Sequence, residues 1–308
     1  MTELAFIENL KATLLAQNPT CGALPIPPGD DCALVSASAK EVLFAADMLM
    51  EGVHFDLSTT TPELVGRKAL AVNLSDIAAM AGTPTAVTVT LALPRSRGSA
   101  LGDRMMRGMI ALANEYKVAI AGGDTNSWGG PLVVSVAVIG DPHPRGSVRR
   151  NGAQPGDWIM VTGSLGGSIH SRHLTFSPRV AEAHLLHRTY GLTSMIDLSD
   201  GLATDLRHIV EESRVGARLD RSRIPIHPDC RRNHDTAEDR VHHALRDGED
   251  FELLFTVPPS TGKAMLEARP FGDQLQLSHI GLITEPNAGL VWDDDAPIVV
   301  TGYTHAFT

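Results

Sequence analysis

Apolar and polar positions along the first half of the chain repeat with two different periods. Over residues 3–16, Leu4, Ile7, Leu10 and Leu14 lie at helical spacing, which predicts an amphipathic helix. Alternating positions and short apolar runs predict strands elsewhere. We expect such strands over residues 41–46, 85–93, 118–121 and 132–139.

Two further helices are predicted between these strands. Thr61 is a good N-cap, and Pro62 suits the first helical position. Because Gly82 suits a helix end, these residues frame a helix of about 20 residues. Residues 99–115 predict another helix. Helices mixed with strands and joined by glycine turns indicate an α/β or α+β protein.

The second half of the chain repeats this order of elements. Residues 141–157 are rich in Pro, Gly and Arg, which is typical of a domain junction. A strand is predicted over 158–162 and an alternating strand over 251–257. Between them a helix is predicted over 197–213, a range that opens with two carboxylates and a glycine. We therefore expect two domains, residues 1–145 and residues 146–308.

Composition excludes several classes of protein. The chain has 43% hydrophobic and 20% charged residues, as a globular enzyme does. A formal net charge of −10 argues against a nucleic-acid surface, which needs a basic stripe. No apolar run approaches the roughly 18 residues of a membrane span, and no signal peptide is expected at the N-terminus. The three cysteines lack CxxC spacing, so we expect neither a zinc site nor a disulfide framework. We expect the protein to be located in the cytoplasm.

Carboxylates recur along the chain, each beside a glycine or at the end of an apolar run. Such carboxylates repel one another when they gather, so a shared pocket needs cations. Hard oxygen ligands favour Mg²⁺, which usually carries substrate phosphates when few carboxylates hold it. We expect these residues to share metal ions in a phosphoryl-transfer site. The candidates are Asp31, Asp47, Asp76, Asp124, Asp197 and Asp200.

Each motif also has a structural explanation. Gly29-Asp30-Asp31 is ordinary turn chemistry, and Asp47 after a strand could cap a helix. Asp197 and Asp200 at a helix start suit capping as well as phosphate binding. Asp76 is harder to explain, because it lies inside an apolar helix and needs solvent or a strong partner.

Other nucleophiles and phosphate loops are not indicated. His54 is more often a loop or packing histidine than a ligand, and Ser199 has no evident histidine partner. The chain contains no GxxxxGK[ST] motif. We therefore expect metal ions, together with arginines such as Arg149 and Arg150, to supply the positive charge that phosphates need.

The motifs together resemble the thiamine-monophosphate kinase family of the aminoimidazole-ribotide-synthetase-like superfamily. The resemblance runs from about Glu3 to Phe307, with the motifs in the order typical of that family. The matching stretches begin with Gly29-Asp30-Asp31-Cys32-Ala33-Leu34, Asp47-Met48-Leu49, Glu51-Gly52-Val53-His54-Phe55 and Lys68 to Met80. They continue with Gly122-Gly123-Asp124-Thr125, Arg150, Ile196-Asp197-Leu198-Ser199-Asp200-Gly201-Leu202, Gly248-Glu249-Asp250-Phe251-Glu252-Leu253 and Gly302-Tyr303.

This resemblance implies a fold and an activity. The fold would be two α/β domains, with an N-terminal mixed sheet that binds ATP and metal and forms a homodimer, and a C-terminal domain that completes the site. The activity would be direct, in-line transfer of the γ-phosphoryl group of ATP onto thiamine monophosphate, giving thiamine diphosphate without a protein nucleophile.

The resemblance also assigns residues to ligands. Several Mg²⁺ ions would be held by the six aspartates already named. ATP would be contacted by Gly123, Asp124, Arg150 and Ser199. Thiamine monophosphate would be contacted by His54, Glu249 and Tyr303.

The chain departs from the family pattern at three places. The usual Ser or Thr before Asp47 is replaced by Ala45 and Ala46, which removes a hydroxyl ligand. The segment 164–178 is short and is expected to lack a helix, and the usual Gly-Gly-Glu-Asp becomes Asp247-Gly248-Glu249-Asp250. Two alternatives therefore stay open: another ATP-dependent enzyme of the superfamily, or a nucleotide- and metal-binding homologue with reduced turnover.

Overall fold

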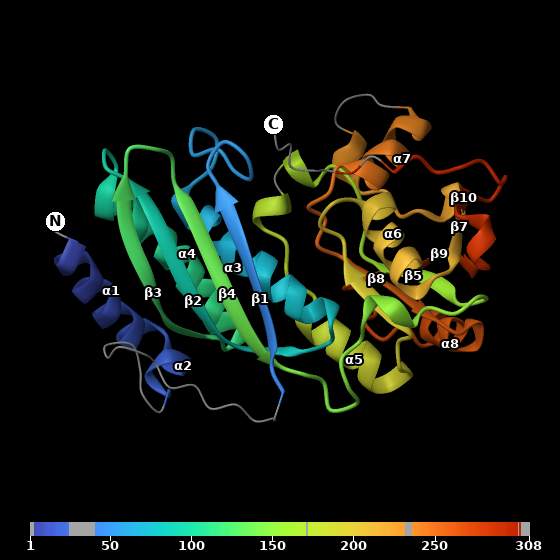
Figure 1. Ribbon diagram of the computed structural model, residues 1–308, viewed down its shortest axis with the longest axis horizontal. Coiled ribbons are helices and arrows are strands. Elements are labelled where there is room, and N and C mark those ends of the chain that lie inside the picture. Colours follow the sequence, from blue (N-terminus) through green and yellow to red (C-terminus); the bar gives the residue numbers. More distant parts are fainter. Residues whose placement is uncertain (1–2, 25–40, 171, 232–235, 301, 303–308) are drawn as a thin grey trace. The chain divides into compact units, whose positions relative to one another are not determined.

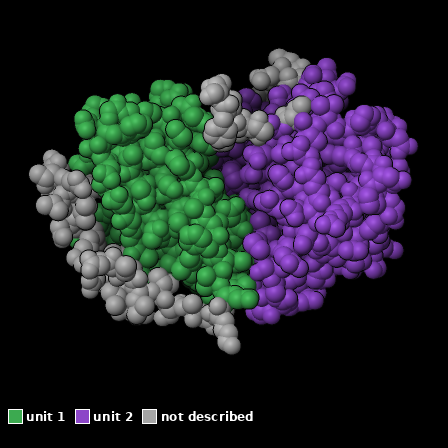
Figure 2. Space-filling model, in the orientation of Figure 1, with its two compact units in different colours: residues 1–77, 82–142 green, residues 78–81, 143–308 purple. Residues whose placement is uncertain are grey.

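The computed structural model describes residues 3–24, 41–170, 172–231, 236–300 and 302. The chain forms two compact units, coloured separately in Figure 2. Unit 1 is Met1–Ile77 with Gly82–Pro142, and unit 2 is Ala78–Ala81 with His143–Thr308. The division after Pro142 falls inside the segment predicted as a junction, while the separate role assigned to each domain stays a prediction. None of the helices that the structure describes has the length and hydrophobicity needed to span a membrane.

Unit 1 is built on a four-stranded mixed sheet, as predicted. Its order is β1-β4-β2-β3, in which β2 and β3 run parallel and the other neighbours run antiparallel. The strands are β1 (Leu43–Met50), β2 (Thr83–Pro94), β3 (Ala119–Trp128) and β4 (Val133–Asp141). The helices are α1 (Glu3–Gln17), α2 (Pro19–Gly22), α3 (Pro62–Ala79) and α4 (Gly98–Tyr116).

The two faces of this sheet differ in character. Helices α3 and α4 cover one face (Figure 1), and there β4 buries Val134, Val136 and Val138 at alternate positions. The opposite face exposes large apolar side chains of the edge strand β1. Phe44 is 71% exposed and Met48 is 55% exposed. Period-two alternation therefore places one apolar face in the core and leaves a second one open.

Helix α3 begins as predicted but ends differently. The Thr61 hydroxyl accepts a hydrogen bond from the Leu64 N–H at 3.3 Å, which confirms the N-cap. The left-handed residue after the helix is Ala81, with φ of 57°, and not Gly82. Gly82 instead allows close packing, because a Cβ there would lie 2.3 Å from Leu43 Cδ1. Gly82 thus marks the end of the helix as predicted, but its role is close packing and not the left-handed conformation.

Two strands of unit 1 extend further than predicted. Strand β1 pairs with β4 as far as Met50, so Asp47 lies within the strand and not at its end. Strand β3 pairs with β2 as far as Trp128, so Asp124 also lies within a strand. Ladder hydrogen bonds to a neighbour outweigh the poor strand propensity of aspartate and glycine.

Unit 2 contains a six-stranded sheet in the order β10-β7-β9-β5-β8-β6. Only β10 and β7 are parallel neighbours. The strands are β5 (Trp158–Thr162), β6 (Ser194–Asp197), β7 (Gly216–Leu219), β8 (Leu253–Val257), β9 (Leu277–Thr284) and β10 (Leu290–Trp292). The helices are α5 (Val180–Tyr190), α6 (Leu202–Ser213), α7 (Ala237–Arg246) and α8 (Pro259–Ala268).

Helices pack on both faces of this second sheet, and β5 shows why. Its Ile159 and Val161 join a core cluster with α6 and α7, whereas Met160 joins another cluster with α5 and α8. Successive residues of a strand point to opposite faces, so a wholly apolar strand serves both layers. The three-layer arrangement holds the ends of β6 and β8 in fixed positions, where several candidate site residues lie.

The helix predicted over 197–213 begins later, at Leu202, because Asp197 is the last residue of β6. The short segment before α5 contains no α-helix in its described residues, 164–170 and 172–178, as expected. It forms two 3₁₀ turns, Ser168–His170 and Arg172–Leu174.

Candidate functional site

Two of the predicted metal ligands lie together in unit 1. Asp47 on β1 and Asp76 on α3 share a hydrogen bond. Burial raises the pKa of Asp47 above its usual range, and the hydrogen bond with Asp76 offsets part of that rise. Asn73, one turn before Asp76, accepts a hydrogen bond from the Asp47 N–H at 3.2 Å. Helix α3 therefore fixes the edge-strand backbone and places a second carboxylate beside the first.

Asp124 lies on the other face of the same sheet. Along the strand register, Asp124 pairs with Thr90, Thr90 with Ser135, and Ser135 with Met48. Directly paired residues point to the same face, so Asp124 shares the exposed face of Met48. Asp47 is adjacent to Met48 and points the opposite way. One copy of unit 1 therefore brings Asp47 and Asp76 together but not Asp124.

Gly123 is needed for the packing of β3 against β2. A Cβ at this position would lie 1.7 Å from the Val89 carbonyl oxygen, a distance that no side chain tolerates. The glycine thus allows the strand that carries Asp124 to approach its neighbour closely, independently of any contact with a nucleotide.

His54 is held by a buried lysine. Lys68, on α3 and 0% exposed, donates from Nζ to the His54 carbonyl oxygen at 2.8 Å. The His54 Nδ1 accepts a hydrogen bond from the Met50 N–H at 3.1 Å, which leaves the proton of a neutral ring on Nε2. Sequence reasoning quoted Lys68 only as part of a motif, and its role in fixing this turn was missed.

Asp197 and Asp200 lie near a third carboxylate, Asp205, in unit 2. Asp205 is buried on α6 and accepts hydrogen bonds from the N–H groups of Asp200 and Gly201, both at 3.1 Å. Burial, together with the charges of Asp197 and Asp200, raises the pKa of Asp205 well above its usual range. This cluster of carboxylates would be relieved by a cation.

Ser199 is joined directly to the segment that carries Glu249. Its carbonyl oxygen accepts a hydrogen bond from the Glu249 N–H at 2.7 Å, and the Leu198 carbonyl accepts one from the Phe251 N–H at 2.8 Å. Both Glu249 and Phe251 have positive φ, 55° and 50°. Left-handed backbone of this kind persists only where surrounding bonds enforce it. A residue assigned to ATP and a residue assigned to the acceptor are therefore one hydrogen bond apart.

Asp250 anchors this strained segment. Its carboxylate is 1% exposed and accepts hydrogen bonds from the Gly166 N–H, the Ser168 hydroxyl and Arg172. Burial raises the pKa of Asp250 to about 6, with Arg172 opposing the rise. In the sequence Asp250 stood out only as part of the Gly248–Leu253 stretch, and its role as a buried anchor was missed.

The remaining candidates are placed less completely. Arg150 is exposed at the start of a 3₁₀ turn, where its carbonyl accepts a hydrogen bond from the Ser213 hydroxyl at 2.8 Å. Asp31 and Tyr303 lie outside the described residues, so their predicted roles stay predictions.

The carboxylate pairs fit magnesium in their chemistry. Mg²⁺ prefers oxygen ligands and is commonly held by one or two carboxylates together with substrate phosphates. Within the described ranges, no group of three or more His, Cys, Asp or Glu side chains is arranged to hold a metal ion. The pair formed by Asp47 and Asp76 therefore suits a site in which Mg²⁺ is bound by two carboxylates and by the phosphates of a substrate.

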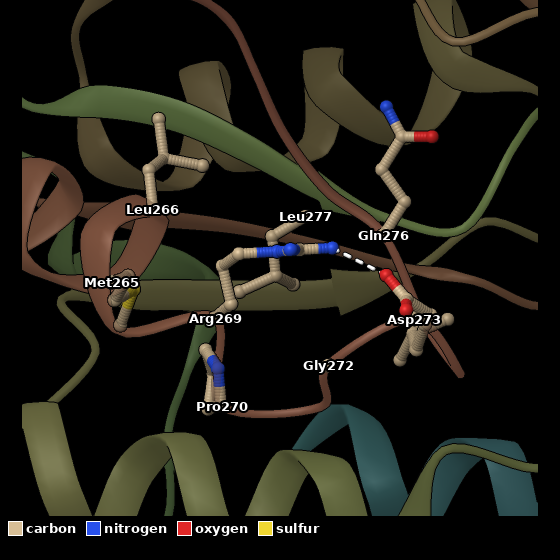
Figure 3. A pocket seen from close by; sticks show the side chains of 9 residues that line it. Met265, Leu266, Arg269, Pro270, Gly272, Asp273, Gln276 and Leu277 are labelled. Atoms are coloured by element: carbon tan, nitrogen blue, oxygen red, sulfur yellow. Dashed lines mark hydrogen bonds and ion pairs between the residues drawn. The ribbon is translucent and has the colours of Figure 1, made fainter.

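A cavity of about 330 Å³ lies elsewhere, at the end of α8 (Figure 3). An exposed ion pair between Arg269 and Asp273 crosses it at 2.6 Å. None of the predicted site residues lines this cavity, so it is not the candidate site. Its lining residues are Met265, Leu266, Arg269, Pro270, Gly272, Asp273, Leu275, Gln276 and Leu277.

Comparison with known proteins is consistent with the sequence motifs. Residues 29–141 match the family described as AIR synthase related protein, N-terminal domain. The thiamine-monophosphate kinase of Rhodopirellula baltica is 38% identical over 256 residues, and the alignment covers 79% of each chain.

Solved structures share the fold over almost the whole chain. Thiamine-monophosphate kinase from Stenotrophomonas maltophilia superposes with a TM-score of 0.81 at 32% identity, covering 95% of this chain and 97% of that one. AaThiL complexed with AMPPCP and TMP superposes with a TM-score of 0.76 at 27% identity, covering 99% and 97%. The chain belongs to the thiamine-monophosphate kinase family.

Proposed function

We propose that the chain catalyses ATP-dependent phosphorylation of thiamine monophosphate to thiamine diphosphate. Family membership over most of the chain carries this proposal. The local geometry supports it, because a candidate nucleotide contact, Ser199, is hydrogen-bonded to a candidate acceptor contact, Glu249. We propose the cytoplasm as the protein's location, as expected from the sequence.

The proposed roles follow from charge. Two phosphorylated substrates repel each other, and bound Mg²⁺ supplies the positive charge that neutralises their oxygens. Asp47 and Asp76 hold metal in unit 1, and Asp197 and Asp200 do so in unit 2. Phosphoryl transfer needs positioning and charge neutralisation more than covalent chemistry, so no protein nucleophile is required.

Each substrate has its own set of protein contacts in this proposal. The nucleotide is contacted by Gly123, Asp124, Arg150 and Ser199. The acceptor is contacted by His54, Glu249 and Tyr303. Glu249 carries a carboxylate suited to the positive charge of the thiamine ring system.

The decisive experiment supplies ATP, Mg²⁺ and thiamine monophosphate and measures thiamine diphosphate by chromatography. Formation of thiamine diphosphate in proportion to ADP supports the kinase. ATP hydrolysis without thiamine diphosphate, or no turnover with saturating substrates, contradicts it.

We also propose that the chain acts as a homodimer through the open face of the unit 1 sheet. Phe44 and Met48 project from an edge strand into solvent, and an apolar face of this kind favours burial against a second copy. Asp124 lies on the same face. A homodimer through this face would therefore place Asp124 at or near the contact between the two copies.

The alternative of a homologue with reduced turnover is prompted by Ala45 and Ala46. Both lie on β1, where Ala45 shares the face of Asp47 and Ala46 points to the opposite face. A lost hydroxyl ligand weakens metal binding, since water must replace it. Ala46→Thr should lower the Mg²⁺ concentration for half-maximal rate if that position matters. An unchanged Mg²⁺ dependence means that the missing hydroxyl is irrelevant.

A further inference from the structure

A buried histidine, His173, contacts the carboxylate of Glu249 on its protein-facing side. The Nδ1 of His173 lies 2.9 Å from Glu249 Oε2. The histidine side chain is only 8% exposed, whereas the glutamate side chain is 24% exposed. The carboxylate can thus meet a ligand from the solvent side while the imidazole donates a hydrogen bond from the protein side.

The backbones that carry both residues are fixed by neighbouring contacts. Arg172, adjacent to His173, pairs with Asp250 at 2.9 Å. Phe176 stacks on Phe251, with ring centroids 4.2 Å apart and planes inclined by 14°. The short segment before α5 and the segment that carries Glu249 are therefore joined at three successive points. Of these three contacts, the one between His173 and Glu249 holds the side chain of a candidate site residue.

We propose that His173 is a positioning residue that sets the affinity for the phosphate acceptor by fixing the Glu249 carboxylate. This inference rests on the proposed function, in which Glu249 contacts thiamine monophosphate. His173 does not touch the substrate; it acts through Glu249.

The physical reason is preorganisation. A free glutamate side chain loses much of its rotamer freedom when a ligand immobilises it. A hydrogen bond from His173 fixes the rotamer during folding, so acceptor binding does not bear this cost. Loss of the hydrogen bond should therefore weaken acceptor binding roughly tenfold, since each tenfold change in affinity is about 1.4 kcal/mol. ATP binding does not involve this carboxylate and should not change.

Three variants test the proposal. His173→Leu removes the donor and keeps an apolar side chain at a buried position. His173→Asn is the conservative variant, because its amide nitrogen takes a place close to Nδ1 and still donates. The matched control is His243→Leu, which removes the histidine that pairs with Asp247 at 3.0 Å in the neighbouring part of the same segment. Each is assayed for kcat and for the KM of both substrates, with Tm recorded.

The expected result is a split between kinetic constants. His173→Leu should raise the KM for thiamine monophosphate roughly tenfold, with little change in the KM for ATP. His173→Asn should restore most of the affinity, and His243→Leu should leave both KM values unchanged. Equal changes in both KM values, an unchanged KM for the acceptor in His173→Leu, or no rescue by Asn would overturn the proposal.

A double-mutant cycle shows whether His173 acts through Glu249. In a Glu249→Gln background, the carboxylate that His173 fixes is absent, so His173→Leu should add little further effect. A full, additive loss in that background contradicts a role through Glu249.

Failure of the proposed function is recognised separately. If the proposed function is wrong, the wild-type protein forms no thiamine diphosphate. The proposal that His173 positions Glu249 for that reaction is then also wrong. The pair itself is observed without substrate by the ring-nitrogen chemical shifts of His173. These shifts should change on Glu249→Gln and stay constant in His243→Leu.

Discussion

Arg179 and Glu252 form an ion pair that joins the start of α5 to the segment leading into β8 in unit 2. The Arg179 Nε donates to Glu252 Oε2 at 2.8 Å, and the Thr162 hydroxyl donates to the same oxygen at 2.6 Å. Both charged side chains are largely removed from solvent. This pair lies beside the strained Glu249–Phe251 backbone, so its integrity bears on the geometry of the candidate site.

Breaking this pair from one side should destabilise the protein strongly. Arg179→Met leaves the Glu252 carboxylate buried without its cation, which costs about 3 kcal/mol in comparable buried pairs. Urea unfolding should show this loss as a lower midpoint with an unchanged slope. Adding Glu252→Gln to Arg179→Met should recover much of the stability, because no buried charge then remains. A single variant as stable as the wild type would show that solvent reaches the carboxylate.

Asp76→Asn should abolish phosphoryl transfer and leave folding intact. Asp76 shares a hydrogen bond with Asp47, whose pKa burial raises; the amide of the introduced asparagine can still donate to Asp47, and the variant removes one of two neighbouring carboxyl groups. Without Mg²⁺ the variant should therefore have a Tm equal to or above that of the wild type. The stabilisation that Mg²⁺ with ATP gives the wild type should shrink, since ligand binding to the folded state raises Tm. Wild-type turnover in this variant would rule out a metal role for Asp76.

Gly248→Ala should weaken acceptor binding by displacing Glu249. Gly248 has φ of 68°, and a Cβ there would lie 2.6 Å from the Ser199 carbonyl oxygen. That oxygen accepts the Glu249 N–H, so the clash falls on the bond that fixes the Glu249 backbone. We expect a loss of about 2 kcal/mol in the free energy of unfolding and a higher KM for thiamine monophosphate.

Gly156→Ala is the matched control for Gly248→Ala. Gly156 also has positive φ, at 93°, but a Cβ there meets no atom within 4 Å. It therefore reports the backbone strain alone. If both variants lose the same stability and neither changes the KM, the contact with Ser199 does not shape the site.

A buried histidine predicts the acid sensitivity of unit 2. Burial, followed by the nearby His184, His187, Arg145 and Arg188, lowers the pKa of His143 from 6.5 to about 4. Between these two pH values the unfolded chain binds more protons at this position than the folded protein does. The free energy of unfolding should therefore fall as pH falls through this window and not change further from this group below pH 4.

The variant that checks this sensitivity is His143→Asn. Its amide oxygen can accept the hydrogen bond that His143 Nδ1 accepts from the Arg145 N–H at 3.0 Å, and it does not titrate. Urea unfolding between pH 6.5 and pH 5, where most carboxylates remain charged, should show a shallower decline than the wild type. Parallel curves would mean that other groups control acid unfolding.

The helices and strands that could be predicted from sequence have apolar residues on one face only, or residues that mark where a helix begins or ends. The helix starting at Thr61–Pro62 and strand β4 are examples. Strand β8 was predicted from an alternating pattern over 251–257, yet its five residues are all buried, as are the four residues of β6, for which no strand was predicted. Short buried segments gain their structure from neighbours in the sheet, which a local pattern does not contain.

The candidate site was predicted as a set of residues but not as an arrangement. Which face Asp124 occupies depends on strand register, and a register shift between Val87 and Thr88 moves β3 by one residue. A shift of one residue exchanges the two faces of a strand, and no single motif encodes it. His173 has no motif at all, because its role depends on contact with Glu249, which is distant in sequence.

The position of Asp124 leads to the last prediction, which concerns the homodimer. A charge on the exposed apolar face should prevent burial of that face against a second copy. Met48→Glu should therefore convert a dimer to a monomer in sedimentation velocity and reduce turnover, while far-ultraviolet circular dichroism stays unchanged. Thr59→Glu, on an exposed turn outside this face, is the control and should remain dimeric.

Mixing two inactive variants shows whether one copy completes the site of the other. Asp76→Asn and Asp124→Asn should each be inactive alone. If Asp124 serves the site that contains Asp76 of the other copy, a mixed dimer has one site with both aspartates intact. Co-refolding equal amounts should then recover about a quarter of the wild-type rate, since half of randomly paired dimers are mixed and each has one of two sites intact. If both aspartates serve the same copy's site, every mixed dimer contains two damaged sites and the mixture stays inactive.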